Sequence, residues 1–160
     1  MLSRHARTAN LLGALGLEAA TVMPAGRGAT MGALVTIAAY PNRTVEELRG
    51  PLGLSQPGAA RLVQRLVDAG LVARGGPGGR GGLRLSCTDT GRRAVDAFAE
   101  QRRAKLLELL DPLTEAERDE FGSMLERMLA ARTEGVPGAK RLCRLCERRV
   151  CERCPVARAA

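Results

Sequence analysis

The sequence predicts a mainly α protein with a small β-hairpin wing, that is, a winged helix-turn-helix. With two Phe, one Tyr and no Trp in 160 residues, the core must consist of Leu, Val, Ala and Met, which favours helix-on-helix packing. Residues 44–70 have the pattern of a short helix, a tight turn and a second helix with a clear stop. Residues 71–88 then suggest two short strands around a glycine-rich tip.

The N-terminal part predicts two helices joined by a linker. Residues 3–20 form an amphipathic pattern, and residues 23–28 (MPAGRG) have the composition of a linker. A second helix is predicted from about Thr30 to Ala39, where Tyr40–Pro41 ends it. The apolar side of the first helix consists of Leu11, Leu12, Leu15 and Leu17.

The helix-turn-helix is marked by its caps. Thr44 is a suitable N-cap, and Glu47, three residues later, completes a capping box. Pro51 falls inside this helix and predicts that it ends or kinks near Arg49–Gly50. Ser55 caps the second helix, and Gly70 is placed to end it in the left-handed conformation.

The second helix has two contrasting sides. Its apolar side is predicted to be buried and consists of Ala59, Leu62, Val63, Leu66 and Val67. The opposite side carries Pro57, Arg61, Gln64 and Asp68, flanked by Gly58 and Arg65. Small, amide and guanidinium side chains opposite a buried stripe suit a helix that lies in a DNA major groove.

The hairpin follows directly. Residues 75–82 (GGPGGRGG) are predicted to form no regular element, because glycine leaves the backbone too free and proline removes a donor. Leu83, Leu85 and Cys87 alternate with polar residues, as in a half-buried strand, and residues 72–74 are its expected antiparallel partner. Cys87 is expected to be a small buried apolar residue.

Two more helices are predicted after the wing. Thr88 caps a long helix that reaches about Leu110, where Asp111–Pro112 breaks it. Thr114 and Glu117 form a second capping box, and Gly135 and Pro137 stop the chain after the last helix. The apolar stripe of that helix consists of Phe121, Met124, Leu125, Met128 and Leu129.

The charge and the lack of catalytic groups narrow the function. A formal net charge of +8 suits a polyanionic partner, although RNA or a membrane surface would also attract it. No stretch approaches a membrane span, and residues 1–25 lack a secretory signal, so we expect a cytoplasmic protein without a membrane partner. We find no nucleophile–base pair, phosphate loop or convergent carboxylates, and His5, the only histidine, lies near a terminus. We therefore expect no enzyme.

The most specific chemical pattern is a pair of CxxC motifs near the C-terminus, formed by Cys143, Cys146, Cys151 and Cys154. Four thiolates at this spacing suit a structural zinc ion, and five neighbouring arginines would offset the negative charge of the site. An iron–sulfur cluster would also accept four cysteines. Reactive redox thiols, disulfides and a basic tail without a ligand are the alternatives.

Together these residues resemble the MarR family of winged helix-turn-helix transcriptional regulators. The resemblance covers roughly residues 28–134. It is carried by Leu54–Pro57, Arg61–Val63, Arg65–Leu66, Ala69–Val72, Arg80 and Leu85–Thr88. One departure is Gly79, which stands where the family usually has an acidic residue before the wing arginine.

The resemblance implies a homodimer on a palindromic operator in double-stranded DNA, with a sensing crevice for a small-molecule effector. The terminal helices would pair between subunits. The implied organisation is an N-terminal dimerisation helix and linker (1–27), a DNA-binding domain (28–91), C-terminal dimerisation helices (92–136) and a basic four-cysteine tail (137–160).

The implied DNA contacts come from the second helix and the wing. Gln56, Pro57, Gly58, Ala60 and Gln64 would lie at base edges, and Arg61 and Arg65 at phosphates or a guanine. Arg80 in the wing would reach the flanking minor groove or its backbone, and the remaining DNA-binding candidates are Ser55 and Arg84. The expected function is a transcriptional repressor that responds to a small ligand or to the state of the four cysteines. Alternatives are a thiol-based redox sensor or thiol oxidoreductase using the CxxC pairs, and an RNA-binding or protein-contact winged helix.

Overall fold

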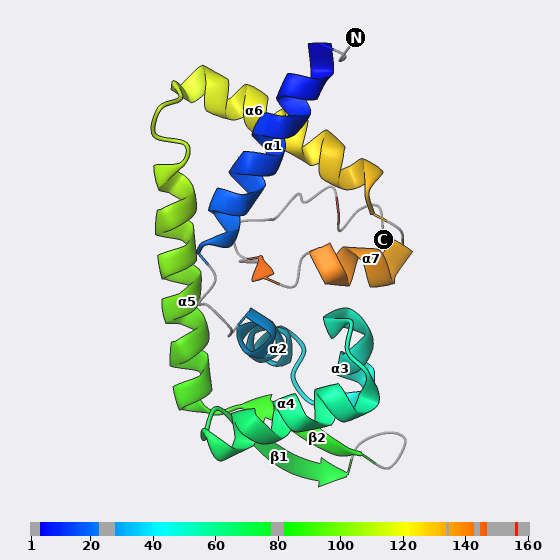
Figure 1. Ribbon diagram of the computed structural model, residues 1–160. Coiled ribbons are helices and arrows are strands. Elements are labelled where there is room, and N and C mark those ends of the chain that lie inside the picture. The colour runs from blue at the N-terminus through cyan, green and yellow to red at the C-terminus, as the bar shows by residue number, and fades with distance from the viewer. Residues whose placement is uncertain are drawn as a thin grey trace.

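The computed structural model describes residues 4–22, 28–77, 82–133, 135–142, 145–146 and 156. Helices and one two-stranded antiparallel hairpin make up the described part of the chain (Figure 1), so the predicted fold class is confirmed. The elements in chain order are α1 (Arg4–Ala20), α2 (Gly28–Ala39), α3 (Val45–Leu52), α4 (Gln56–Asp68), β1 (Val72–Pro77), β2 (Leu83–Cys87), α5 (Asp89–Glu108), α6 (Glu115–Ala131) and α7 (Gly135–Leu142).

One hydrophobic core holds α2, α3, α4 and the hairpin together, with α2 at its centre. Its members are Ala33, Leu34, Ile37, Leu48, Leu62, Val63, Leu66, Val72, Leu85 and Cys87. From this unit α5 rises along one side of the molecule, and α6 and α1 lie at its far end (Figure 1). Within the described residues, no helix is long and apolar enough to cross a bilayer.

Helix α3 keeps its predicted capping box but is longer than predicted. It continues through Pro51 and ends at Leu52, so the expected end near Arg49–Gly50 is wrong. Proline near the end of a short helix removes only one intrahelical hydrogen bond. The helix closes at Gly53, whose φ of 65° is left-handed, and the Leu54 N–H donates to the Arg49 carbonyl at 3.0 Å.

The α3 capping box makes the stability of the fold depend on pH. Hydrogen bonds from the Thr44 backbone and from Arg43 lower the pKa of Glu47 to about 2. Because this folded-state pKa lies below that of the unfolded chain, the carboxylate stabilises the fold above about pH 4.5, and this contribution is lost as the pH falls towards 2. We expect Glu47→Gln to flatten the decline of the thermal unfolding midpoint between pH 5 and pH 2. Glu46→Gln, one position earlier and outside the cap, is the charge-matched control; identical declines in both variants would contradict this account.

The hairpin differs from its prediction at two points. Strand β1 extends to Pro77, so the first three residues of the glycine-rich stretch are regular after all, with an irregular register between Arg74 and Pro77. The ladder to β2 supplies the order that the sequence lacks, and the irregularity accommodates the proline. Leu83 is 49% exposed rather than buried, whereas Leu85 and Cys87 are in the core. Residues 78–81 lie outside the described part of the chain.

The C-terminal helices begin at the predicted caps, Thr88 for α5 and the capping box of Thr114 and Glu117 for α6. Helix α6 ends before Gly135, but the chain then forms α7, which the sequence analysis did not predict. Gly135 turns the chain with a φ of 62°, and α7 packs against α3. Proline in a first helical turn favours a helix start, and Pro137 occupies that place.

Candidate nucleic-acid interface

Helix α4 lies across the end of the molecule with one side in the core and the other in solvent (Figure 1). Its buried residues are Ala59, Leu62, Val63 and Leu66, four of the five predicted; Val67 is partly buried beside them. The N-terminus begins as the sequence predicts, because the Ser55 hydroxyl accepts the Gly58 N–H at 3.3 Å. Gly70 has a φ of 67°, so the predicted left-handed stop is confirmed.

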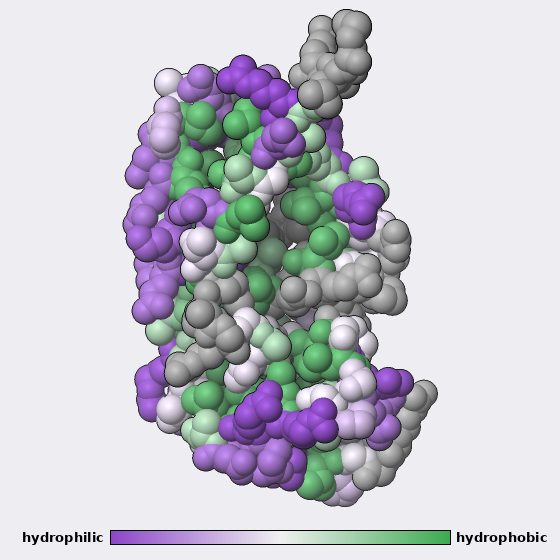
Figure 2. Space-filling model, in the orientation of Figure 1, coloured by the Kyte–Doolittle hydropathy of each residue, from purple (hydrophilic) through white to green (hydrophobic). Residues whose placement is uncertain are grey.

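Most of the predicted DNA-contacting residues are exposed in the structure. The predicted DNA contacts that are exposed are Ser55, Gln56, Pro57, Ala60, Arg61, Gln64 and Arg65 at α4, and Arg84 on β2. Gly58 is half-buried, and Arg80 lies outside the described residues. Figure 2 shows hydrophilic side chains gathered over this end of the molecule, where α4 lies.

Arg61 and Arg65 are exposed and differ in their surroundings from several other surface arginines. Arg43, Arg49 and Arg92 each form an ion pair with a nearby carboxylate, at 2.9, 2.7 and 3.2 Å. Within the described part of the chain, no such ion pair is made by Arg61 or Arg65. The outer face of α4 therefore carries two positive charges that internal carboxylates do not neutralise.

Arg84 has a structural role in addition to its exposure. Its guanidinium donates to the Pro77 carbonyl at 3.2 Å and to the Asn42 carbonyl at 3.3 Å. Leu85 also makes two backbone hydrogen bonds, to Asn42 and to Arg43, each 2.9 Å long, so an isolated β-bridge ties the α2–α3 turn to the hairpin. Arg84 thus anchors the wing while some of its five N–H donors remain available.

Arg74 is a candidate site residue that the sequence pattern does not indicate. This β1 residue donates from its guanidinium to the Gln64 side-chain oxygen at 2.9 Å, and the Gln64 amide donates to Asp68 at 2.7 Å. The strand was predicted, but the contact joins two elements whose relative placement the sequence does not show.

The junction between α4 and α5 was also missed. Thr88 donates from its hydroxyl to the Gly70 carbonyl at 2.7 Å and from its N–H to the Leu71 carbonyl at 3.1 Å. The same hydroxyl accepts the Gly91 N–H at 3.0 Å. These bonds fix the end of α4 against the start of α5.

Of the four cysteines predicted to hold a metal, only Cys146 is among the described residues, and it is half-buried. Cys143, Cys151 and Cys154 lie outside them, so the zinc site remains a prediction. The prediction for Cys87 is confirmed: it is 5% exposed, burial raises the pKa of its thiol, and the Sγ donates to the Leu34 carbonyl at 3.7 Å.

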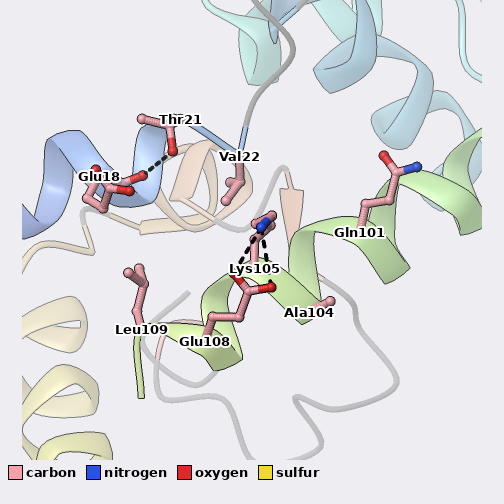
Figure 3. Close-up of a pocket in the computed structure, with 8 residues that line it drawn as sticks. All are labelled: Glu18, Thr21, Val22, Gln101, Ala104, Lys105, Glu108 and Leu109. Atoms are coloured by element: carbon pink, nitrogen blue, oxygen red, sulfur yellow. Dashed lines mark hydrogen bonds and ion pairs between the residues drawn. The ribbon is translucent and has the colours of Figure 1, made fainter. Parts of the chain in front are cut away.

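An open pocket of about 540 Å³ lies between the end of α1 and the C-terminal half of α5 (Figure 3). Its walls are mixed in character. Lys105 donates to Glu108 at 2.9 Å inside it, and Val22, Ala104 and Leu109 supply apolar surface. The remaining lining residues are Glu18, Thr21 and Gln101. The pocket has room for a small organic molecule.

Comparisons with known proteins agree with this geometry. Residues 28–81 match the model of the MarR family. RV1404 from Mycobacterium tuberculosis has a similar structure, with a TM-score of 0.67 and 26% identity over 84% of this chain and 97% of that one. Comparison with curated proteins gave no match.

Two further solved structures share the fold at lower identity. One is Streptococcus pneumoniae FabT in complex with DNA, with a TM-score of 0.56 and 17% identity over 78% of this chain and 90% of that one. The other is the M. tuberculosis MarR family protein RV2887 with p-aminosalicylic acid, with a TM-score of 0.53 and 22% identity over 79% of this chain and 98% of that one. The resemblance to the MarR family is therefore confirmed, through the matched residues 28–81 and through a fold shared with solved members of that family.

Proposed function

We propose that the protein is a dimeric cytoplasmic transcriptional regulator, acting as a repressor, that binds a palindromic operator in double-stranded DNA. The observation that carries the proposal is the outer face of α4, where Arg61 and Arg65 have no carboxylate partner among the described residues. Two such helices, one per subunit, would lie in successive major grooves about one helical turn apart. The fold shared with FabT, which was solved bound to DNA, supports this placement.

The test is selection of bound duplexes from a random-sequence DNA pool. A regulator of this kind is expected to enrich one pseudo-palindromic sequence and to bind it about 10³-fold or more tighter than random duplex at physiological salt. Enrichment of no common sequence, or equal affinity for single-stranded RNA, would remove the proposal and favour an RNA-binding winged helix.

The proposed dimer accounts for the apolar residues left exposed at the far end of the molecule, where Figure 2 shows hydrophobic surface around a hollow. They include Leu11, Leu12, Leu15 and Leu17 of α1 and Met124, Met128 and Leu129 of α6. No described residue of α6 is buried within the single chain. An amphipathic helix without a covered face requires a partner.

We expect the double variant Leu12→Asp/Leu15→Asp to sediment as a monomer at concentrations where the wild type is a dimer. The side chains are 45% and 37% exposed in the single chain, so charges there should be tolerated until a second subunit covers them. Loss of operator binding should accompany the loss of the dimer. Arg7→Asp on the same helix is the control, and a dimer in both variants would place the interface elsewhere.

The pocket between α1 and α5 is the proposed site of a small hydrophobic or phenolic effector. The pocket lies between α1, a proposed dimerisation helix, and α5, which begins directly after the wing. A ligand that binds there can therefore shift α5 relative to the dimer interface and change the distance between the two α4 helices of the dimer. RV2887, which shares the fold, was solved with p-aminosalicylic acid. Release of the selected duplex by salicylate, and no release from a Leu109→Arg variant, would support this assignment.

For the four cysteines we propose a bound zinc ion, on the strength of their spacing. A native mass spectrum of protein purified without chelator is expected to show one zinc per chain, and Cys151→Ser/Cys154→Ser should lose it. Cys87→Ser controls for thiol loss outside the motif. A metal-free protein lighter by the hydrogens of one or two disulfides would favour redox sensing instead, and an iron–sulfur mass would replace the zinc.

A further inference from the structure

Asp68 is an unexpected residue on the proposed DNA-facing side of α4. It is exposed on the same face as Arg61 and Gln64, where phosphate groups would repel its carboxylate. Its position is explained by one contact: its Oδ1 accepts the Gln64 side-chain N–H at 2.7 Å.

Gln64 is held from its other end as well. Its Oε1 accepts from the Arg74 guanidinium at 2.9 Å, so the three side chains form a chain from Asp68 through Gln64 to Arg74. A carboxylate only accepts hydrogen bonds and a guanidinium only donates them. A rotated amide would set oxygen against carboxylate and N–H against guanidinium. The two charged neighbours therefore permit a single orientation of the amide.

We propose that Asp68 and Arg74 are positioning residues that fix Gln64 for recognition of an adenine on one particular strand. A glutamine amide pairs with adenine in the major groove by donating to N7 and accepting from the N6 amino group. After the two internal bonds, the amide of Gln64 still has one N–H and one lone pair. A freely rotating amide could exchange the positions of this N–H and this lone pair, whereas the fixed amide keeps each of them in one position. This inference rests on the proposed DNA-binding function.

The expected consequence is a base preference that depends on residues away from the base. Gln64→Ala should erase the preference at one base pair of each half-site. Arg74→Ala and Asp68→Ala should relax the preference for A·T over T·A at that same pair by about 5- to 150-fold, the range for a bidentate contact, and leave other pairs unchanged. Arg74→Ala should also weaken binding overall, because it removes a positive charge.

Conservative variants separate positioning from charge and folding. Asp68→Glu keeps a carboxylate that can only accept from the Gln64 N–H, so it should retain the preference. The amide of Asp68→Asn can either donate or accept, so this variant should relax the preference as Asp68→Ala does. Arg74→Lys keeps a donor and should retain the preference. Arg84→Ala, on β2, is the control for an exposed arginine outside this chain of contacts; it should alter affinity without altering the preference at the Gln64 base pair.

The experiment is duplex selection with wild type and each variant, followed by titration of duplexes that differ only at the pair identified by Gln64→Ala. Failure of the wild type to enrich a sequence overturns the proposed function itself. If the wild type enriches a sequence but Gln64→Ala changes no pair, or Arg74→Ala and Asp68→Ala lower affinity uniformly, the positioning inference is overturned and DNA binding is retained. Relaxation at the Gln64 pair alone in the two alanine variants, with the preference retained in Asp68→Glu and Arg74→Lys, supports it.

Discussion

Replacing Arg61 and Arg65 together by alanine is expected to abolish specific operator binding while leaving the fold intact. Both side chains are exposed on α4, and neither has an ion-pair partner in the described part of the chain, so their removal costs no internal ion pair. Each arginine that holds a phosphate or a guanine contributes about 1–3 kcal/mol, roughly 5- to 150-fold in affinity. Because the proposed dimer presents four such arginines, the double variant should lose at least about 4 kcal/mol, roughly 10³-fold in affinity.

The salt dependence of binding makes this prediction more specific than a loss of affinity. Each phosphate contact contributes about 0.9 to the steepness of the plot of log affinity against log salt concentration. Two lost phosphate contacts per subunit should therefore reduce the slope by about 4 for a dimer. If the arginines contact guanines instead, the slope should change by less. The matched control is Arg103→Ala/Arg127→Ala, which lowers the formal net charge of +8 by the same two units from helices α5 and α6. Equal losses in both double variants would mean that overall charge, rather than α4, attracts the DNA.

The parts of the structure that the sequence predicts best depend on local signals. Both capping boxes, at Thr44 and Thr114, involve residues three positions apart, and both are present. The left-handed stop at Gly70 and the buried stripe of α4 are equally local, because helix periodicity alone determines which side chains share a face. The exposure of the candidate residues on α4 follows from the same periodicity, whereas their contact with DNA stays a prediction.

The mispredicted parts depend on contacts between distant segments. Strand β1 extends to Pro77 because β2 supplies hydrogen bonds that no composition rule anticipates. Helix α7 is stabilised against α3, far from it in sequence, and the glycine and proline at its start suggested only an end. Arg74 has an ordinary position in a strand and becomes part of the candidate site only because β1 folds back beside α4. Local patterns predict which residues face outward, but only the assembled fold shows which outward residues meet.

The strongest stability effect is expected at Gly91, in the first turn of α5. A Cβ built at this position would lie 2.0 Å from the Leu71 carbonyl oxygen and 3.0 Å from its carbon. Backbone atoms cannot rotate away as a flexible side chain does, so either the start of α5 or the turn after α4 must shift. That shift would strain the bonds from Thr88 to Gly70 and Leu71. We expect Gly91→Ala to cost about 3 kcal/mol, which lowers the thermal midpoint by roughly 6–12 °C.

Gly122→Ala in α6 makes the same substitution where nothing lies within 4 Å of the new Cβ, so it controls for helix propensity. Since alanine favours helices over glycine, this variant should gain about 0.5–1 kcal/mol. The thermal unfolding midpoint is therefore expected to fall in Gly91→Ala and to rise in Gly122→Ala. A Gly91→Ala protein as stable as wild type would contradict the close approach of α5 to Leu71. Because that approach sets the angle between α4 and the long helix, any Gly91→Ala protein that stays folded should also bind the selected duplex more weakly than Gly122→Ala does.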